Sequence, residues 1–219
     1  MCDFELASIQ AVQEVFAGAE VCGCFFYLRQ SIFRRVQKEG LYNNYIENEQ
    51  VRMYVKFLGA LALVPPADVA DSFDEIQDAD DFPAELDTLY AYFEATYIGR
   101  RLRRGRRPPR FPIGLWNQTD RVQAGMPRTN NLLEGWHNGI QSSLDGNRPT
   151  IWKFLQFLQR EEQLQRTIIA SVTAGNDTRR ESKESKARTQ RLQTLLRDYG
   201  NRNRHDFLRG VSYNITLPI

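Results

Sequence analysis

The sequence predicts a mainly α-helical protein with one or two short strands. Apolar residues recur at helical spacing over long stretches, such as residues 3–16 and 151–172. Two of the earlier stretches end at Gly18 and Gly40, and glycine is a common helix stop. The short apolar run Ala19–Phe26 fits a buried strand instead. The beginning of the chain is therefore predicted as helix, strand and helix, with further helices after it.

Length and composition are those of a globular protein that we expect to stay inside the cell. The 219 residues, 42% of them hydrophobic, suffice for one sizeable domain with a buried core. The longest apolar run, Phe57–Val64, is much shorter than the ~18 residues of a membrane span, so we expect no membrane partner. The acidic N-terminus predicts no secretory signal, and three cysteines without disulfide-framework spacing fit a reducing compartment.

The first segment, residues 1–40, carries the first candidate for chemistry. Its first helix is predicted over residues 3–16, and its second ends near Gly40. Asp3 lies at the start of the first helix. A carboxylate in that position serves either as an N-terminal cap or as a metal ligand.

Residues 41–97 are predicted to be wholly helical, an arginine-rich loop follows, and residues 111–127 are predicted as a loop with one short helix. Helices are expected over Glu49–Leu63, from Pro65 to Ile76 and from Pro83 to Tyr97. Residues 68–94 are acidic, and the sign of the charge then reverses in the string RRLRRGRRPPR. The arginines of this string are Arg100, Arg101, Arg103, Arg104, Arg106, Arg107 and Arg110.

The arginine-rich loop has three interpretations. Gly105 and the pair Pro108–Pro109 prevent a regular helix, and guanidinium groups on an irregular segment suit the phosphates of nucleic acid. A nuclear localisation signal has the same composition. In the third interpretation, the loop is docked on the acidic helices that precede it.

Residues 129–175 contain the second candidate for chemistry. The string RTNNLLEGWHNGIQSSL predicts a helix that Thr129 or Asn130 caps. At about 100° per residue, one side of this helix is polar. The polar side carries Asn130, Glu134, His137, Asn138 and Gln141. Glu134 is either a functional carboxylate or an ordinary exposed helix acid.

Several features around this helix extend the prediction. Gly135 and Gly139 inside it suggest the close approach of another backbone or a ligand. A long helix capped by Thr150 follows. Its apolar stripe, expected to be buried, comprises Ile151, Phe154, Leu155, Leu158, Ile168, Ile169 and Val172. Residues 176–219 are predicted as a charged linker and a helical tail, with His205 at the surface.

A zinc site is a further possibility. Cys22 and Cys24 would point the same way on a strand, and His137 would add a third ligand of the type that zinc prefers. Without a second paired element, the alternative is that all three side chains are ordinary structural residues.

Three features in order resemble one known family. They are CDFELA at the start, GCFFYLRQSI after the predicted strand, and RRLRRGRRPPRFPIGLWN followed by RTNNLLEGWHN and PTIWKFL. Together they resemble the Mutator-like (MULE) transposase domain of insects and other animals, which often occurs in chains with FLYWCH-type zinc fingers. The resemblance covers about Asp3 to Leu158, and no FLYWCH finger is present.

The resemblance implies a truncated RNase H-like core whose DDE acids bind two Mg²⁺ or Mn²⁺ ions. Asp3 matches the second acid and Glu134 the third, and both would be metal ligands and catalytic residues. Residues 41–128 would be an all-helical insertion. Asn130, His137 and Gln141 would contact DNA phosphates or orient Glu134.

Two departures from the family pattern affect the expected activity. The first acid of the family belongs on a strand upstream of Met1, and the C-x-x-H signature is degenerate here, with Cys24 and Tyr27 at its two ends. A phenol titrates near 10 and cannot replace a neutral imidazole at pH 7. We therefore expect the chain alone to lack transposase activity.

The expected function is that of a transposase-derived, nuclear, DNA-binding protein, either truncated or domesticated. The arginine-rich loop would contact the phosphate backbone, and a homo-oligomer or a full-length transposase is a possible partner. One alternative is an active Mg²⁺-dependent DDE transposase whose first acid is supplied upstream or in trans. Another is a helical module that binds protein partners.

Overall fold

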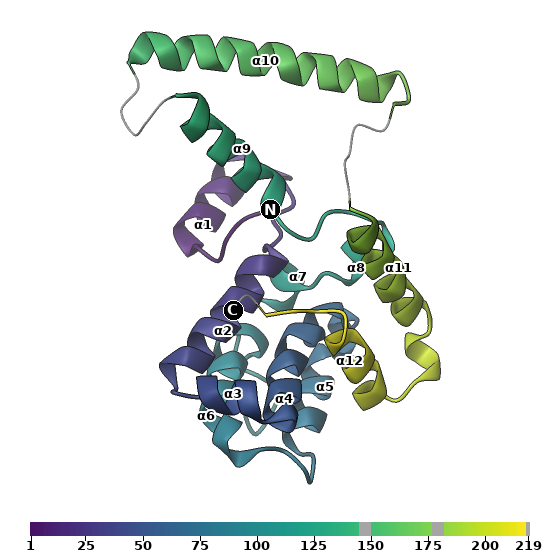
Figure 1. The fold of residues 1–219 in the computed structure, drawn as a ribbon. Helices are drawn as coiled ribbons and strands as arrows, with labels where there is room; N and C mark the ends of the chain where they lie inside the picture. The colour runs from purple at the N-terminus through teal and green to yellow at the C-terminus, as the bar shows by residue number, and fades with distance from the viewer. Residues whose placement is uncertain (145–149, 177–181, 218–219) are drawn as a thin grey trace. The chain divides into compact units, whose positions relative to one another are not determined.

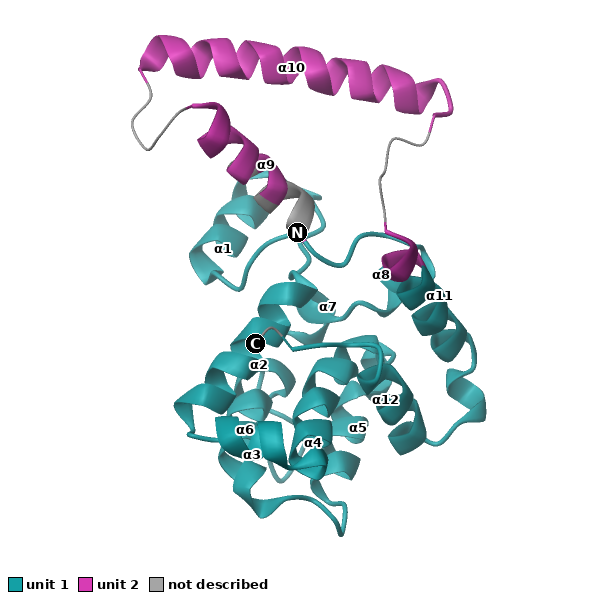
Figure 2. Ribbon diagram, in the orientation of Figure 1, with its two compact units in different colours: residues 1–129, 187–219 teal, residues 130–186 magenta. Residues whose placement is uncertain are grey.

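The computed structural model describes residues 1–144, 150–176 and 182–217, without the side chains of residues 131–134 and 137. The chain forms two compact units (Figure 2). Unit 1 comprises residues 1–129 and 187–219, and unit 2 comprises residues 130–186. The predicted mainly α-helical fold is confirmed, since helices make up most of the described chain.

Helix α4 lies at the centre of unit 1 (Figure 1). It spans Glu49–Ala60, and the side chain of Asn48 caps it by accepting hydrogen bonds from the backbone N–H groups of Gln50 and Val51 at 2.9 and 3.3 Å. Most of its residues are buried, because neighbouring helices cover several of its sides. Those neighbours include α2 (Phe25–Lys38), α3 (Tyr42–Glu47) and α12 (Arg204–Ser212).

Short helices complete the first part of unit 1, and they follow the predicted order. The remaining elements up to residue 129 are α1 (Leu6–Val15), η1 (Leu61–Leu63), η2 (Pro66–Asp68), α5 (Val69–Gln77), η3 (Ala84–Leu86), α6 (Asp87–Phe93), η4 (Glu94–Ile98), α7 (Ile113–Trp116) and α8 (Thr119–Gln123). The three helices predicted between residues 49 and 97 are confirmed, each with a short 3₁₀ or π segment at one or both ends. The π-helical turn η4 leads directly into the arginine-rich loop.

Aromatic rings fill the core around α5, α6 and α7. Phe93 lies at ring-centroid distances of 4.9 Å from Tyr97 and 5.9 Å from Trp116, and all three side chains are fully buried. The indole N–H of Trp116 donates to the carbonyl oxygen of Tyr97 at 3.1 Å. These contacts fix the end of η4, and thereby the point where the arginine-rich loop begins.

The C-terminal tail packs on α4 and α5 of unit 1. It contains α11 (Lys183–Arg197), η5 (Tyr199–Asn201) and α12, from which Phe207, Leu208 and Val211 are buried. The Tyr199 hydroxyl donates to a carboxylate oxygen of Asp68 at 3.0 Å. His205 is half-buried with its ring 5.2 Å from that of Phe57, so its predicted place at the surface is only partly correct.

The strand predicted over Ala19–Phe26 is wrong. Residues 21–24 are extended, but they make only an isolated parallel bridge between Cys2 and Gly23, and α2 already begins at Phe25. The Gly23 N–H donates instead to the carbonyl oxygen of Leu115, at 2.6 Å. An RNase H-like sheet is therefore not seen among the described residues, because this segment pairs with loops rather than with further strands.

Unit 2 contains α9 (Asn131–Ser143) and α10 (Ile151–Thr173), both predicted from the sequence. The Thr150 side chain caps α10, as predicted, by accepting from the Lys153 N–H at 3.3 Å. The predicted burial of its apolar stripe is wrong, since no residue of α10 is buried and Ile151 and Ile169 are each more than 60% exposed. A Cβ atom on Gly135 or Gly139 would meet nothing within 4 Å, so the predicted close approach at these glycines is absent from the described structure.

Candidate nucleic-acid interface

The arginine-rich loop folds into a short hairpin, residues 100–107. Its arms are joined by hydrogen bonds from the Arg107 N–H to the Arg100 carbonyl and from the Leu102 N–H to the Gly105 carbonyl, each 2.9 Å long. Gly105 closes the tip with φ +74°. Gly99 starts the hairpin with φ +97°, and a Cβ atom there would overlap the carbonyl oxygen of Arg107. Both positions therefore favour glycine.

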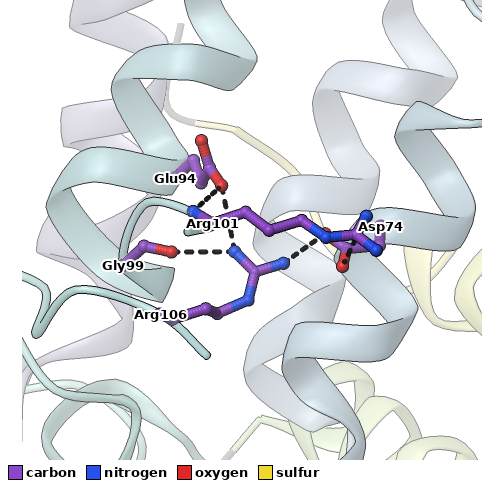
Figure 3. A network of polar contacts seen from close by, with 5 residues as sticks. All are labelled: Asp74, Glu94, Gly99, Arg101 and Arg106. Atoms are coloured by element: carbon purple, nitrogen blue, oxygen red, sulfur yellow. Dashed lines mark hydrogen bonds and ion pairs between the residues drawn. The ribbon is translucent and has the colours of Figure 1, made fainter. Parts of the chain in front are cut away.

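Arg106 anchors the hairpin to two acidic residues of the helices (Figure 3). One guanidinium nitrogen forms an ion pair with Asp74 of α5, and another lies 3.0 Å from a carboxylate oxygen of Glu94 in η4. The second nitrogen also donates to the Gly99 carbonyl at 2.8 Å. Glu94 accepts a further hydrogen bond from the Arg101 N–H at 2.9 Å. The Arg106 side chain is only 18% exposed, so it belongs to the structure of the hairpin.

The other arginines of the loop stay at the surface. Arg101 lies 3.5 Å from Asp74 but its side chain is 67% exposed, and the Arg110 guanidinium lies over the Phe111 ring at 5.4 Å. Arg103 and Arg104, at the tip, make no salt bridge within the described part of the chain. The exposed arginines are Arg100, Arg101, Arg103, Arg104, Arg107 and Arg110. Docking of the loop on the acidic helices, the third interpretation, therefore holds for Arg106 and in part for Arg101.

The structure brings three of the predicted site residues together beside this hairpin. Asp3, Tyr27 and Arg110 line one open hollow of about 650 Å³ in unit 1. The first turn of α2 forms part of its wall, because the Cys24 N–H donates to the Cys2 carbonyl at 2.8 Å and so places Asp3 next to that turn. Asp3 is exposed and does not cap α1, whose N-cap residue is Glu5. The capping interpretation of Asp3 is therefore wrong.

Further cations line the same hollow, and the sequence analysis did not single them out. They are Arg34, Arg35 and Lys38, all on α2. Arg35 forms an ion pair with Glu39 at 2.5 Å, and its guanidinium lies over the Tyr92 ring at 4.6 Å. The available signal was helical spacing, because residues 27, 31, 34 and 38 share one face of a helix.

The second predicted acid belongs to the other unit. Glu134 lies in α9 of unit 2, as do Asn130 at its N-cap and the exposed Gln141. The side chains of Glu134 and His137 lie outside the described residues. Among the described residues, no group of three or more His, Cys, Asp and Glu side chains is arranged to hold a metal ion. Asp3 alone does not supply the several oxygen ligands that Mg²⁺ or Mn²⁺ requires.

The cysteines of the possible zinc site lie in the buried segment just before α2. Cys22 and Cys24 are buried free thiols, and Cys2 is a half-buried one whose pKa is raised mainly by burial. The third predicted ligand, His137, falls outside the described side chains. Cys24 also occupies the N-cap position of α2 and Tyr27 its first turn, so both ends of the degenerate signature have structural roles.

Comparisons of the chain with family models, with curated proteins and with solved structures find no match. Within the described residues, every helix is too short or too polar to cross a membrane. The functional argument therefore depends on the geometry of the hairpin and the hollow.

Proposed function

We propose that this chain is a DNA-binding protein whose arginine hairpin contacts the phosphate backbone. The observation that carries the proposal is the division of roles among the arginines. Arg106 is held by Asp74 and Glu94, and this anchor leaves Arg103 and Arg104 at the tip with no carboxylate within salt-bridge distance among the described residues. Exposed guanidinium groups on a defined turn suit phosphate oxygens and the release of counterions.

The expected binding is independent of DNA sequence and sensitive to salt. We expect dissociation constants of about 10⁻⁴ to 10⁻⁶ M for duplex DNA at physiological salt. The resemblance to Mutator-like transposases supports this proposal. It also suggests a transposase ancestry and a nuclear location, which we propose together with DNA binding. Self-association and binding to a full-length transposase remain predictions of the same resemblance.

A salt series on labelled duplex DNA tests the proposal. The variant Arg103→Gln/Arg104→Gln removes two tip charges, so the slope of log K against log salt should fall by roughly 1.8, or 0.9 for each lost phosphate contact. The matched control Arg160→Gln/Arg197→Gln removes two exposed arginines, one from α10 and one from α11, that make no salt bridge among the described residues. Equal effects of the two variants, or binding that is indifferent to salt, would refute the role of the hairpin.

One observation favours a second candidate function, a helical protein-interaction module. The 23 residues of α10 form an amphipathic helix without a single buried side chain, which exposes Trp152 and Leu155 among others. The same arginine variant separates the two functions. If the chain is only a protein-interaction module, neither the unchanged protein nor Arg103→Gln/Arg104→Gln binds nucleic acid.

The enzymatic alternative concerns an assembly in which the first acid is supplied upstream or in trans. It predicts divalent-metal-dependent nicking of DNA by that assembly, abolished by Glu134→Gln. Glu134→Gln should leave salt-dependent DNA binding by the hairpin intact, because Glu134 belongs to unit 2 and the hairpin to unit 1. Nicking that survives Glu134→Gln would remove Glu134 from the catalytic assignment.

A further inference from the structure

We infer that the hollow lined by Asp3, Arg34, Lys38 and Arg110 is a second nucleic-acid site, which binds the phosphate groups of a single strand. This inference rests on the proposed function, because it assigns a second contact surface to the same ligand class. The charges, the shape and the wall chemistry of the hollow all suit such a ligand.

Unpaired cations dominate one part of the hollow. Arg34 and Lys38 are exposed, lie one helical turn apart on α2, and make no salt bridge within the described chain. Arg35 next to them is already neutralised by Glu39 at 2.5 Å. Arg110 enters the hollow from the segment that follows the hairpin. Three cations that line one hollow and make no salt bridge among the described residues favour an anionic ligand.

The charge of the hollow changes along its length, because its carboxylates and its cations lie at different places. Asp3 lies next to the first turn of α2, whereas Lys38 is the last residue of the helix, roughly 20 Å further along at 1.5 Å per residue. Glu5, the other lining acid, accepts a hydrogen bond from the Ser8 hydroxyl at 2.9 Å. Phosphates are repelled at Asp3 and attracted at Arg34 and Lys38. An acid at the far end suits the hydroxyl or amino donors of a nucleotide instead.

Size and wall chemistry favour a single strand over a duplex. A volume of about 650 Å³ lies within the range of pockets that hold small ligands, and it is too small for a double helix. Phe4, Tyr27 and Tyr92 contribute aromatic surface to walls that also carry the charged side chains. A cationic groove with aromatic side chains is the usual arrangement for single-stranded nucleic acid.

Lys38 also has a structural role, which the experiment must separate from ligand binding. It lies in the last turn of α2, where positive charge stabilises the helix dipole. Such a role predicts lower stability for Arg34→Gln/Lys38→Gln without any specific effect on ligand binding. The charge-conserving variant Arg34→Lys/Lys38→Arg keeps the favourable dipole interaction as well as the cationic surface.

The test measures the binding of labelled oligonucleotides, single-stranded and duplex, to the full chain over a salt series. We expect Arg34→Gln/Lys38→Gln to weaken single-strand binding about tenfold and to lower its salt slope by roughly 1.4, or 0.7 for each phosphate. Duplex binding should change much less. Arg34→Lys/Lys38→Arg should restore single-strand binding, and thermal unfolding should show that each variant is folded.

The outcomes separate this inference from the proposed function. The inference is overturned if duplex binding depends on Arg103 and Arg104 while single-strand binding is unaffected by Arg34→Gln/Lys38→Gln. The proposed role of the hairpin fails, and the inference stands, if single-strand binding depends on Arg34 and Lys38 while neither tip arginine matters. Absence of all nucleic-acid binding at low salt overturns both.

Discussion

Removing the Arg106 side-chain charge should destabilise unit 1 without removing an exposed cation. In Arg106→Gln, Asp74 and Glu94 lose their shared partner, and the Gly99 carbonyl loses a hydrogen bond. Charge-assisted hydrogen bonds contribute about 1.5–3 kcal/mol each when desolvated. The three side chains here are 18–25% exposed, so solvent reduces the contribution of each contact. We expect Arg106→Gln to lower the free energy of unfolding by about 2 kcal/mol in total.

Urea unfolding measures this loss in the free energy of unfolding of unit 1, followed by the fluorescence of the buried Trp116 in a Trp136→Phe/Trp152→Phe background. A domain of this size should also show a fall in melting temperature of roughly 4–8 °C for 2 kcal/mol. The exposed Arg103 is the control, because Arg103→Gln should change the free energy of unfolding by less than about 0.5 kcal/mol. A double-mutant cycle with Asp74→Asn should give a coupling energy above about 1 kcal/mol.

Two results would refute this reasoning. If Arg106→Gln and Arg103→Gln have the same free energy of unfolding, the ion pairs of Arg106 stabilise unit 1 no more than an exposed arginine does. If the coupling energy between Arg106 and Asp74 is close to zero, the hairpin is held by its backbone hydrogen bonds and by Gly99 instead.

The remaining predictions concern the hairpin base, the tail and the aromatic core. Gly99→Ala should lower the free energy of unfolding in urea by about 2–4 kcal/mol, because Gly99 has a positive φ and the added Cβ would overlap the Arg107 carbonyl oxygen. The control Gly114→Ala should be nearly neutral, because its Cβ would meet nothing within 4 Å. Phe207→Ala should cost about 3–5 kcal/mol in the same assay, showing that the tail is part of unit 1; a loss below 1 kcal/mol would contradict this. Burial raises the pKa of Tyr90 and of Tyr97, so the folded state retains protons that the unfolded state releases near pH 10. Their contribution to stability is complete below pH 10 and is lost as the pH rises further. In an alkaline titration, phenolate absorbance from these two residues should therefore appear only as the helical circular dichroism disappears, and full ionisation near pH 10 with helicity retained would exclude the effect.

Most helices of unit 1 follow from local signals in the sequence. The start of α4 at Asn48 and the break at Pro65 depend on capping and on the missing proline N–H, which act within one turn. The end of α2 near Gly40, with φ +73°, is equally local. Such elements were predictable because no distant residue decides them.

The strand predicted around Cys22 and Cys24 shows where local reasoning ends. A short apolar run fits a buried strand and a buried loop equally well. The deciding contacts come from far along the chain, since the Gly23 N–H donates to Leu115 and the amide side chain of Gln118 donates to the Gly23 carbonyl at 2.9 Å. Helix α7 and the N-cap of α8, more than ninety residues away, therefore provide the partners that a second strand would have supplied.

The hollow was hidden from the sequence for the same reason. Asp3 and Tyr27 came from the resemblance and Arg110 from composition, and nothing in their spacing predicted that all three line one surface. Arg34 and Lys38 looked like ordinary exposed positions of an amphipathic helix. Their significance depends on Arg110, which the fold brings to them from more than seventy residues later in the chain.

The arginine-rich loop could not be assigned to one role from its composition, because its arginines have different roles. Arg106 satisfies the docking interpretation, since Asp74 and Glu94 hold it. Arg106 is therefore not available to contact DNA, but its ion pairs fix the turn on which Arg103 and Arg104 are exposed. A flexible loop would lose conformational entropy on binding phosphate, whereas a hairpin that is already ordered loses less. Arg106→Gln should therefore weaken DNA binding even though Arg106 does not face the ligand, and it should do so mainly by loosening the hairpin.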